Sequence, residues 1–151
     1  GWEGYFVRTG HVNEALYEDL PFRSSPRCLE LGFVERSRIP ALMALATVVV
    51  QPGNADPFNA YRLPAKIPEY LMMARPLIMG RTNIAAELQA QGAARIVDSM
   101  NAISLAQALR ELLADPSAAR QMGQRGRDLA LARFAAARVT PALLAFYQQC
   151  L

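Results

Sequence analysis

The run Thr47-Val48-Val49-Val50 decides the fold class of this chain. An unbroken series of β-branched and apolar residues predicts a strand that is buried on both faces, as in a parallel sheet. A polar segment rich in turn residues, 51–61, follows this strand. A second apolar run, Pro76-Leu77-Ile78-Met79, ends at Gly80 and predicts a neighbouring strand.

The same alternation of strands and helices extends outward from these two runs. We expect further strands over 5–8, 28–34 and 94–97, and helices over 12–20, 38–46, 65–74, 83–91 and 103–113, with the last two helices starting at Asp115-Pro116 and at Pro141. This alternation predicts an α/β fold, with a Rossmann-like, mostly parallel sheet and helices on both faces. A chain of 151 residues fits a single domain over 1–151.

Composition narrows the class of protein. Hydrophobic residues make up 52% and charged residues 19% of the chain, which is ordinary for a globular protein and argues against disorder. No apolar run reaches the ~18 residues of a membrane-spanning helix, and no signal peptide opens the chain, so we expect a cytoplasmic protein. Cys28 and Cys150 are expected to be free thiols. Because His11 is the sole histidine, we expect neither a zinc site nor a histidine-dependent triad.

The only lysine lies in the segment Leu63-Pro64-Ala65-Lys66-Ile67-Pro68-Glu69. An ammonium group suits a phosphate approached end-on, and the predicted helix start beside it favours an anion. Glu69 follows three residues later and lies close to Lys66 on the helix surface. The two side chains could hold two ends of one polar ligand, such as a nucleotide. The alternative is a solvated ion pair on a surface helix, which is common at this spacing.

The position of this segment in the fold favours a ligand. In open α/β sheets, ligands bind outside the carboxyl ends of the strands. The polar segment 51–61 leaves the carboxyl end of the 47–50 strand and leads directly into the Lys66 helix. The sequence contains no G-x-G-x-x-G and no G-x-x-x-x-G-K-[ST], so NAD or ATP chemistry has little support.

Several segments together resemble the C-terminal half of group 1 retaining glycosyltransferases, which have the GT-B fold. The segments are Leu31-Gly32-Phe33-Val34 with residues 39–46, the strand 48–52, Pro64-x-Lys66-x-x-Glu69-Tyr70-Leu71 with Arg75-Pro76-Leu77-Ile78, residues 105–116, Met122-Gly123-x-x-Gly126-Arg127, and Arg133-Phe134. Each segment is short, and their order and spacing are more specific than any one of them. The resemblance covers nearly the whole chain.

The resemblance implies a role for the Lys66 segment. Glu69 matches the glutamate that binds the ribose hydroxyls of the donor, and Lys66 matches a lysine of one branch of the family. Backbone N–H groups around Leu63, Pro64, Ala65 and Lys66 would then face the diphosphate.

The resemblance also implies that Asp56, Asn59 and Tyr61 face the transferred sugar. Tyr61 stands where the common family motif has a further glutamate, and Ala74 stands where the family usually has glycine.

The implied activity is transfer of a hexosyl-type sugar from a nucleotide-diphosphate sugar to an acceptor, in polysaccharide biosynthesis. It requires no other cofactor and no metal, and the sequence identifies no catalytic residue. The family's C-terminal domain opens with another strand and helix that carry an Arg and a Lys, and an acceptor-binding domain precedes it. Neither is present here, so we expect a fragment that is inactive alone, whose partners are the nucleotide sugar and the missing N-terminal domain. An open sheet edge would favour a homodimer.

The runner-up interpretation is a non-catalytic α/β interaction module. Arginines crowd the last third of the chain, at positions 120, 125, 127, 133 and 138. They could form a patch for nucleic acid or an acidic membrane, or they could be an ordinary solvated helix face. No nucleic-acid motif accompanies them, so for a donor-binding domain we expect no nucleic-acid partner and only a peripheral membrane contact. An interaction module could use the arginines for either a membrane or nucleic acid.

Overall fold

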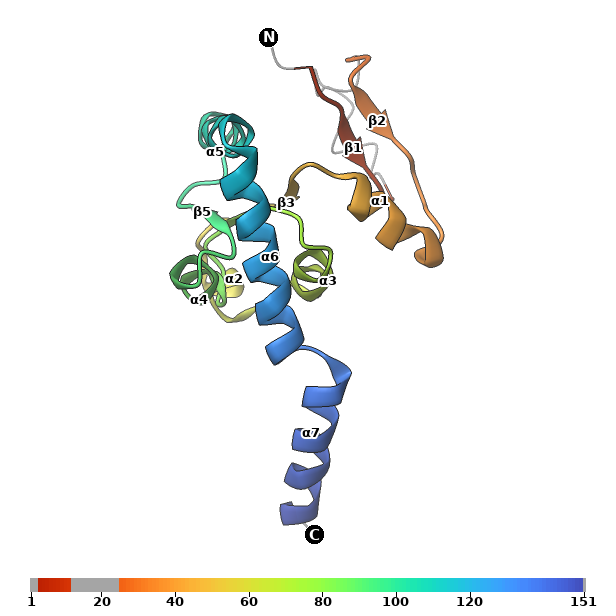
Figure 1. Cartoon of the computed structure of the whole chain (residues 1–151), viewed down its shortest axis with the longest axis vertical. Helices are drawn as coiled ribbons and strands as arrows, with labels where there is room; N and C mark the ends of the chain where they lie inside the picture. Colours follow the sequence, from red (N-terminus) through yellow and green to blue (C-terminus); the bar gives the residue numbers. More distant parts are fainter. Residues whose placement is uncertain (1–2, 12–24, 151) are drawn as a thin grey trace. The chain divides into compact units, whose positions relative to one another are not determined.

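The computed structural model describes residues 3–11 and 25–150 (Figure 1). The helix predicted over 12–20, and most of the loop after it, lie outside the described residues. The chain forms two compact units, Gly1–Ile39 and Pro40–Leu151. The single domain expected over 1–151 stays a prediction.

The first unit contains a parallel pair of strands, β1 (Phe6–Arg8) and β2 (Cys28–Glu30). Phe6 lies opposite Cys28 and Arg8 opposite Glu30, which brings the guanidinium within 3.4 Å of the carboxylate. A 3-10 helix, η3 (Arg36–Arg38), leads into α1 (Ile39–Leu45). Both strands predicted for this part of the chain are therefore present, although the second is shorter than expected.

The second unit is built on a parallel sheet in the order β3-β4-β5. Its strands are β3 (Val49–Gln51), β4 (Leu77–Gly80) and β5 (Arg95–Val97). Every residue of the central strand β4 is buried. A parallel strand that is apolar on both faces needs helices on both sides, and this confirms the predicted fold class.

Besides α1, nearly all of which belongs to this unit, further helices surround or extend the sheet (Figure 1). They are α2 (Pro57–Tyr61), α3 (Lys66–Met72), α4 (Ala85–Ala90), α5 (Ala102–Ala114), α6 (Pro116–Arg133) and α7 (Ala136–Cys150). Alternate residues of β4 belong to two different core clusters. Leu77 and Met79 pack with residues of α3, α4 and α6, whereas Ile78 packs with residues of α5 and the start of α6. The core therefore lies on both faces of the sheet.

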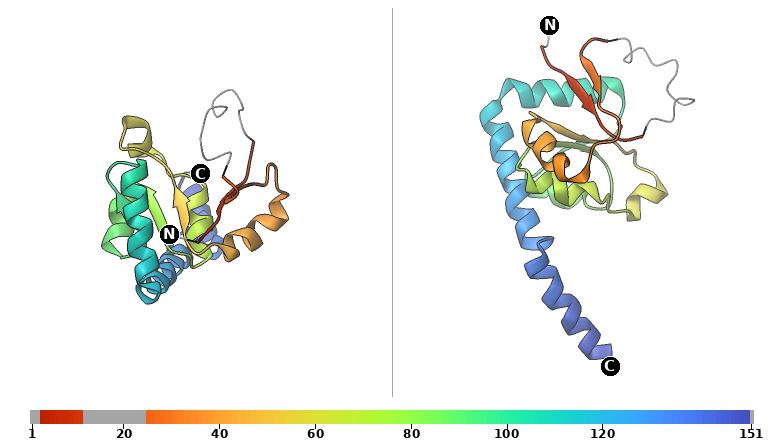
Figure 2. Two further views of the ribbon diagram at one scale, coloured as in Figure 1. Left: turned by 90° about the horizontal axis from the view of Figure 1, so that it is seen from above. Right: turned by 90° about the vertical axis from the view of Figure 1, so that its right-hand side faces the viewer.

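Side-chain caps set the starts of α5 and α6. The Asn101 side chain accepts a hydrogen bond from the backbone N–H of Ser104 at 2.9 Å. Asp115 accepts from the N–H groups of Ser117 and Ala118, at 3.1 and 2.9 Å. Pro116 occupies the first turn of α6, where its missing N–H costs nothing. This confirms the predicted helix start at Asp115-Pro116, and the chain turns sharply there between α5 and α6 (Figure 2).

Two glycines let α6 lie directly on the end of α3. A Cβ atom placed on Gly123 would lie 2.2 Å from the carbonyl oxygen of Ala74, and one on Gly126 would lie 2.9 Å from Cδ2 of Leu71. Ala74, just beyond the end of α3, has a φ of 53°, in the left-handed region. That conformation explains why a glycine is usual at this position.

The structure corrects two expectations about helices. The turn residues of the segment 51–61 predict a loop, but its last five residues form α2, because Asp56 caps it and Pro57 suits its first position. The prediction that the last helix begins at Pro141 is wrong. α7 begins at Ala136 and Pro141 lies inside it, because the strong helix formers Ala136 and Ala137 start the helix earlier.

The described residues of α7 are exposed along its whole length. The helical stretch Pro116–Cys150 includes an 18-residue window with a mean hydropathy of 1.5, so by length and composition alone it could cross a membrane. The expectation from apolar runs missed this window because it contains scattered polar residues. Core helices of soluble proteins pass the same test and are mostly buried, whereas only 6% of this window is buried. Cys28 and Cys150 are free thiols, as predicted.

Candidate functional site

The segments that follow β3 and β4 meet at the carboxyl edge of the sheet. A Cβ atom on Gly80, the last residue of β4, would lie 1.5 Å from the carbonyl oxygen of Gly53. Only a glycine at position 80 therefore allows the chain leaving β3 to cross so closely over the end of β4. The crossing directs residues 54–61 over this edge of the sheet.

Asp56 and Asn59 fix the start of α2. The Asp56 carboxylate accepts from the backbone N–H of Asn59 at 2.7 Å with one oxygen, and from Nδ2 of Asn59 at 2.7 Å with the other. The Asn59 N–H lowers the pKa of Asp56, and the Asn59 amide and the charge of Arg62 act in the same direction. Asp56 therefore has a structural role as a cap, while its contact with a sugar stays a prediction.

Further hydrogen bonds join α2 to the segments after β4 and β5. The backbone N–H of Asn83 donates to the carbonyl of Asn59, and Nδ2 of Asn83 donates to the carbonyl of Tyr61, both at 3.2 Å. The side-chain oxygen of Asn54 accepts from the backbone N–H of Met100 at 3.1 Å. No motif in the sequence includes Asn54 or Asn83. Each lies three residues after the end of a strand, and this position is the signal that could have found them.

Two buried side-chain oxygens at this edge have no hydrogen-bond partner among the described residues. They are Oδ1 of Asn59, whose residue is 8% exposed, and Oγ1 of Thr82, whose residue is 7% exposed. Both side chains lie beside Gly53, since a Cβ atom there would be 3.8 Å from Asn59 Oδ1 and 3.7 Å from Thr82 Cγ2. Nδ2 of Asn59 is already bonded to Asp56, so the free oxygen of this amide can only accept.

Lys66 and Glu69 lie on the first turn of α3. Because β3 and β4 are parallel, the connecting helix α3 runs back along the sheet, and its first turn is at the carboxyl edge. Ile67 and Leu71 are fully buried, whereas Lys66 and Glu69 are exposed. No ion pair joins Lys66 to Glu69 in the part of the chain that the structure describes. Both charges are therefore open to a ligand.

The residues between α2 and α3 present both apolar and backbone groups. Pro64 is buried and its carbonyl accepts from the N–H of Ile67 at 3.0 Å, whereas Ala65 is exposed and Leu63 is 40% exposed. Tyr61 is 87% exposed. The structure thus brings Asp56, Asn59, Tyr61, residues 63–66 and Glu69 to one edge of the sheet, as expected, but it does not test their roles.

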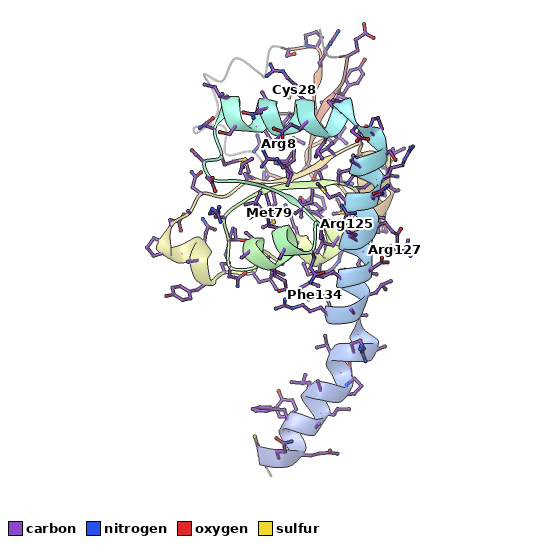
Figure 3. All side chains as sticks on the ribbon, turned by 60° about the vertical axis from the view of Figure 1, so that its left-hand side comes forward. Arg8, Cys28, Met79, Arg125, Arg127 and Phe134 are labelled. Carbon is purple, nitrogen blue, oxygen red and sulfur yellow. The ribbon has the colours of Figure 1, made fainter. Side chains whose placement is uncertain are left out.

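The arginines of the runner-up interpretation lie on α6 and α7. Figure 3 labels Arg125 and Arg127, both on α6. Two of them have partners within the second unit. Nε of Arg125 donates to the carbonyl of Gly92 at 2.9 Å, and Arg133 forms an ion pair with Glu87. Arg127 is exposed. Part of this charge therefore stabilises the fold.

Comparison with known proteins identifies the family. Residues 24–129 match the family model described as glycosyl transferases group 1. The chain belongs to this family. A search of the curated proteins finds no match.

Solved structures support the same fold for this glycosyltransferase chain. Sucrose-phosphate synthase from Thermosynechococcus elongatus superposes with a TM-score of 0.75 at 22% identity, over 91% of this chain and 33% of that one. HepE from Anabaena, in complex with UDP and glucose, gives a TM-score of 0.79 at 18% identity, over 95% of this chain and 40% of that one. The same protein in complex with UDP-glucose also gives 0.79, at 18% identity, over 96% and 41%. The chain thus spans less than half the length of these proteins, and the predicted Rossmann-like half of a GT-B architecture is confirmed.

Proposed function

We propose that this chain is the donor-binding domain of a glycosyltransferase, and that it holds a nucleotide-diphosphate sugar for transfer of its glycosyl group. The observation that carries the proposal is the exposed first turn of α3 at the carboxyl edge of the sheet, where Lys66 and Glu69 have no ion-pair partner among residues 3–11 and 25–150. The ligands named for HepE, UDP and UDP-glucose, support this class of donor.

The proposed contacts follow from the chemistry of each group. The two oxygens of the Glu69 carboxylate accept from the two vicinal hydroxyls of the ribose. The Lys66 ammonium lies near the diphosphate and offsets the charge that develops there as the bond to the sugar breaks. Backbone N–H groups of Leu63, Ala65 and Lys66 add donors to the diphosphate, whereas Pro64 has no N–H to donate.

On the sugar side, Asn59 and Tyr61 are the proposed neighbours of a transferred hexosyl group. The phenol of Tyr61 can donate and accept one hydrogen bond each, unlike the carboxylate usual at this position. In the reaction, the bond from the anomeric carbon to the diphosphate oxygen breaks and a bond to an acceptor oxygen forms. No metal or further cofactor is part of this proposal.

The same proposal includes the location of the acceptor-binding domain and the cellular compartment of the enzyme. Because the chain spans 33–41% of the similar structures, we place the acceptor-binding domain in the remaining part of a longer protein. The chain alone should then bind a nucleotide and transfer no sugar. A cytoplasmic enzyme of polysaccharide biosynthesis fits the free thiols Cys28 and Cys150, which suit a reducing compartment. A homodimer and a peripheral membrane contact stay predictions.

Calorimetric titration of UDP, GDP and ADP into the chain tests the proposal. We expect one nucleotide to bind, and Glu69→Ala to weaken it by about 10–100-fold, the usual cost of losing hydrogen bonds to a charged group. Asp128→Asn is the matched control, because it removes one negative charge from the exposed surface of α6. Absence of binding by all three nucleotides, or equal binding by Glu69→Ala and wild type, would contradict the proposal.

A further inference from the structure

Asn83 follows the end of β4, and the proposed donor contacts do not include it. Asn83 is exposed, but its backbone N–H and its side-chain amide both form hydrogen bonds with α2. The backbone N–H donates to the carbonyl of Asn59, and the side-chain amide donates to the carbonyl of Tyr61, each at 3.2 Å. Carbonyl oxygens only accept, so the nitrogen of the Asn83 amide must face Tyr61.

The segment that Asn83 holds is the second half of α2. The last carbonyls of a helix have no partner within it, and Asn83 supplies donors to two of them. The first turn of α2 is fixed by Asp56, which lies on the same segment. A helix of five residues is too short to be stable alone, so its place over the sheet depends on bonds from elsewhere. Asn83, in the connection between β4 and α4, provides two such bonds.

The bonded segment leads directly into the proposed donor contacts. Tyr61 is separated from Lys66 by four residues, and its aromatic ring is free while its carbonyl is held. On the opposite face of α2, Asn59 is buried and its free oxygen lies beside Gly53. A displacement of residues 59–61 would therefore move the groups on both sides of the site together.

We infer that Asn83 is a positioning residue for the donor, which acts by holding Asn59 and Tyr61 and thereby the segment that leads to Lys66. This inference rests on the proposed function. Asn83 itself needs no contact with the donor. Holding the segment in place before binding removes an ordering cost from the binding step, so donor affinity depends on it.

Two substitutions separate the hydrogen bond from side-chain packing. Asn83→Ala removes the amide, and Asn83→Asp keeps its shape but places an oxygen that cannot donate opposite the Tyr61 carbonyl. For whichever of UDP, GDP and ADP binds the wild type, both variants should bind about tenfold more weakly, which corresponds to about 1.4 kcal/mol. Gln89→Ala, an exposed amide on α4, is the control and should bind as wild type does.

Hydrogen–deuterium exchange provides a readout that general destabilisation would not give. In both Asn83 variants, exchange should rise in peptides covering 57–63 and stay unchanged in those covering 77–80. Wild-type affinity in both variants overturns the inference and leaves the proposed function intact. Faster exchange throughout the second unit, with a large fall in melting temperature, also overturns it, because Asn83 would then be only structural. Absence of nucleotide binding by the wild type overturns the proposed function and the inference together.

Discussion

At the scale of single residues, Ala74 departs from the usual backbone preference of its type. Its φ of 53° places it in the left-handed region, which costs a residue with a Cβ atom about 1–2 kcal/mol. The conformation is needed because the chain must turn from the end of α3 toward β4. The neighbouring Gly123 leaves room for the Ala74 carbonyl, so the strained turn and the close helix contact occur at one place.

Ala74→Gly should stabilise the protein by about 0.5–1 kcal/mol, because relief of the strained φ exceeds the extra chain entropy of glycine in the unfolded state. Urea unfolding measures the difference. The control, Ala106→Gly in the interior of α5, should lose about 1 kcal/mol. A loss of stability in Ala74→Gly would contradict this expectation. The packing of the Ala74 Cβ would then contribute more to stability than the left-handed φ costs.

Residue patterns predicted only part of the candidate site. The spacing of Lys66 and Glu69 placed both on the exposed face of one helix turn, as the structure finds, because local spacing determines helix faces. The bonds from Asn83 to Asn59 and Tyr61 could not be predicted, since they join a backbone N–H and a side-chain amide to carbonyls of a separate segment that only the folded sheet brings near. The unpartnered oxygen of Thr82 was missed for the same reason.

At the scale of helices and strands, the parallel sheet was the most predictable part. The apolar runs 47–50 and 76–79 overlap β3 and β4 and show no alternation, because these strands are buried on both faces, although β3 begins only at Val49 and includes Gln51. Helix boundaries were less predictable, because proline fits both a first turn and a turn outside a helix. Pro57 and Pro116 each lie in a first turn, whereas Pro141 lies inside α7 and removes one of its hydrogen bonds.

The contact between α6 and α3 allows a paired prediction. Gly123→Ala should destabilise the protein by about 2 kcal/mol or more, because its Cβ would meet backbone atoms at 2.2 Å that cannot move aside. Gly126→Ala should be within about 1 kcal/mol of wild type, since the flexible end of Leu71 can shift and alanine favours the helix by about 1 kcal/mol. Denaturant unfolding of the two variants measures both values, and equal losses would contradict the close backbone contact.

At the scale of the whole molecule, stability should come from the sheet and the helices packed on it, and not from α7. Its large apolar side chains are 45–59% exposed, at Val139, Leu143, Leu144, Phe146 and Tyr147. Stability follows the apolar area removed from water, and in this chain α7 removes little. By contrast, Ala119, Gly123, Gly126 and Ala130 of α6 are buried.

Ending the chain after Ala135 should therefore change the melting temperature by less than about 2 °C. The circular dichroism signal at 222 nm should fall in proportion to the 15 residues of α7. Ending the chain after Asp115 is the control and should abolish cooperative unfolding, because the buried residues of α6 are lost as well. A fall of several degrees on removal of α7 alone would mean that α7 covers part of the core.

The crossing of Gly53 over Gly80 also provides a way to observe the site with uniform ¹⁵N enrichment and no attached chemical tag. Glycine amides occupy a distinct region of a ¹⁵N–¹H correlation spectrum, and this chain has only nine glycines. A molecule that settles on the carboxyl edge would shift the resonances of this pair, while glycines such as Gly92, at the end of α4, would keep theirs. Candidate donors could thus be screened by following the amide resonances of Gly53 and Gly80.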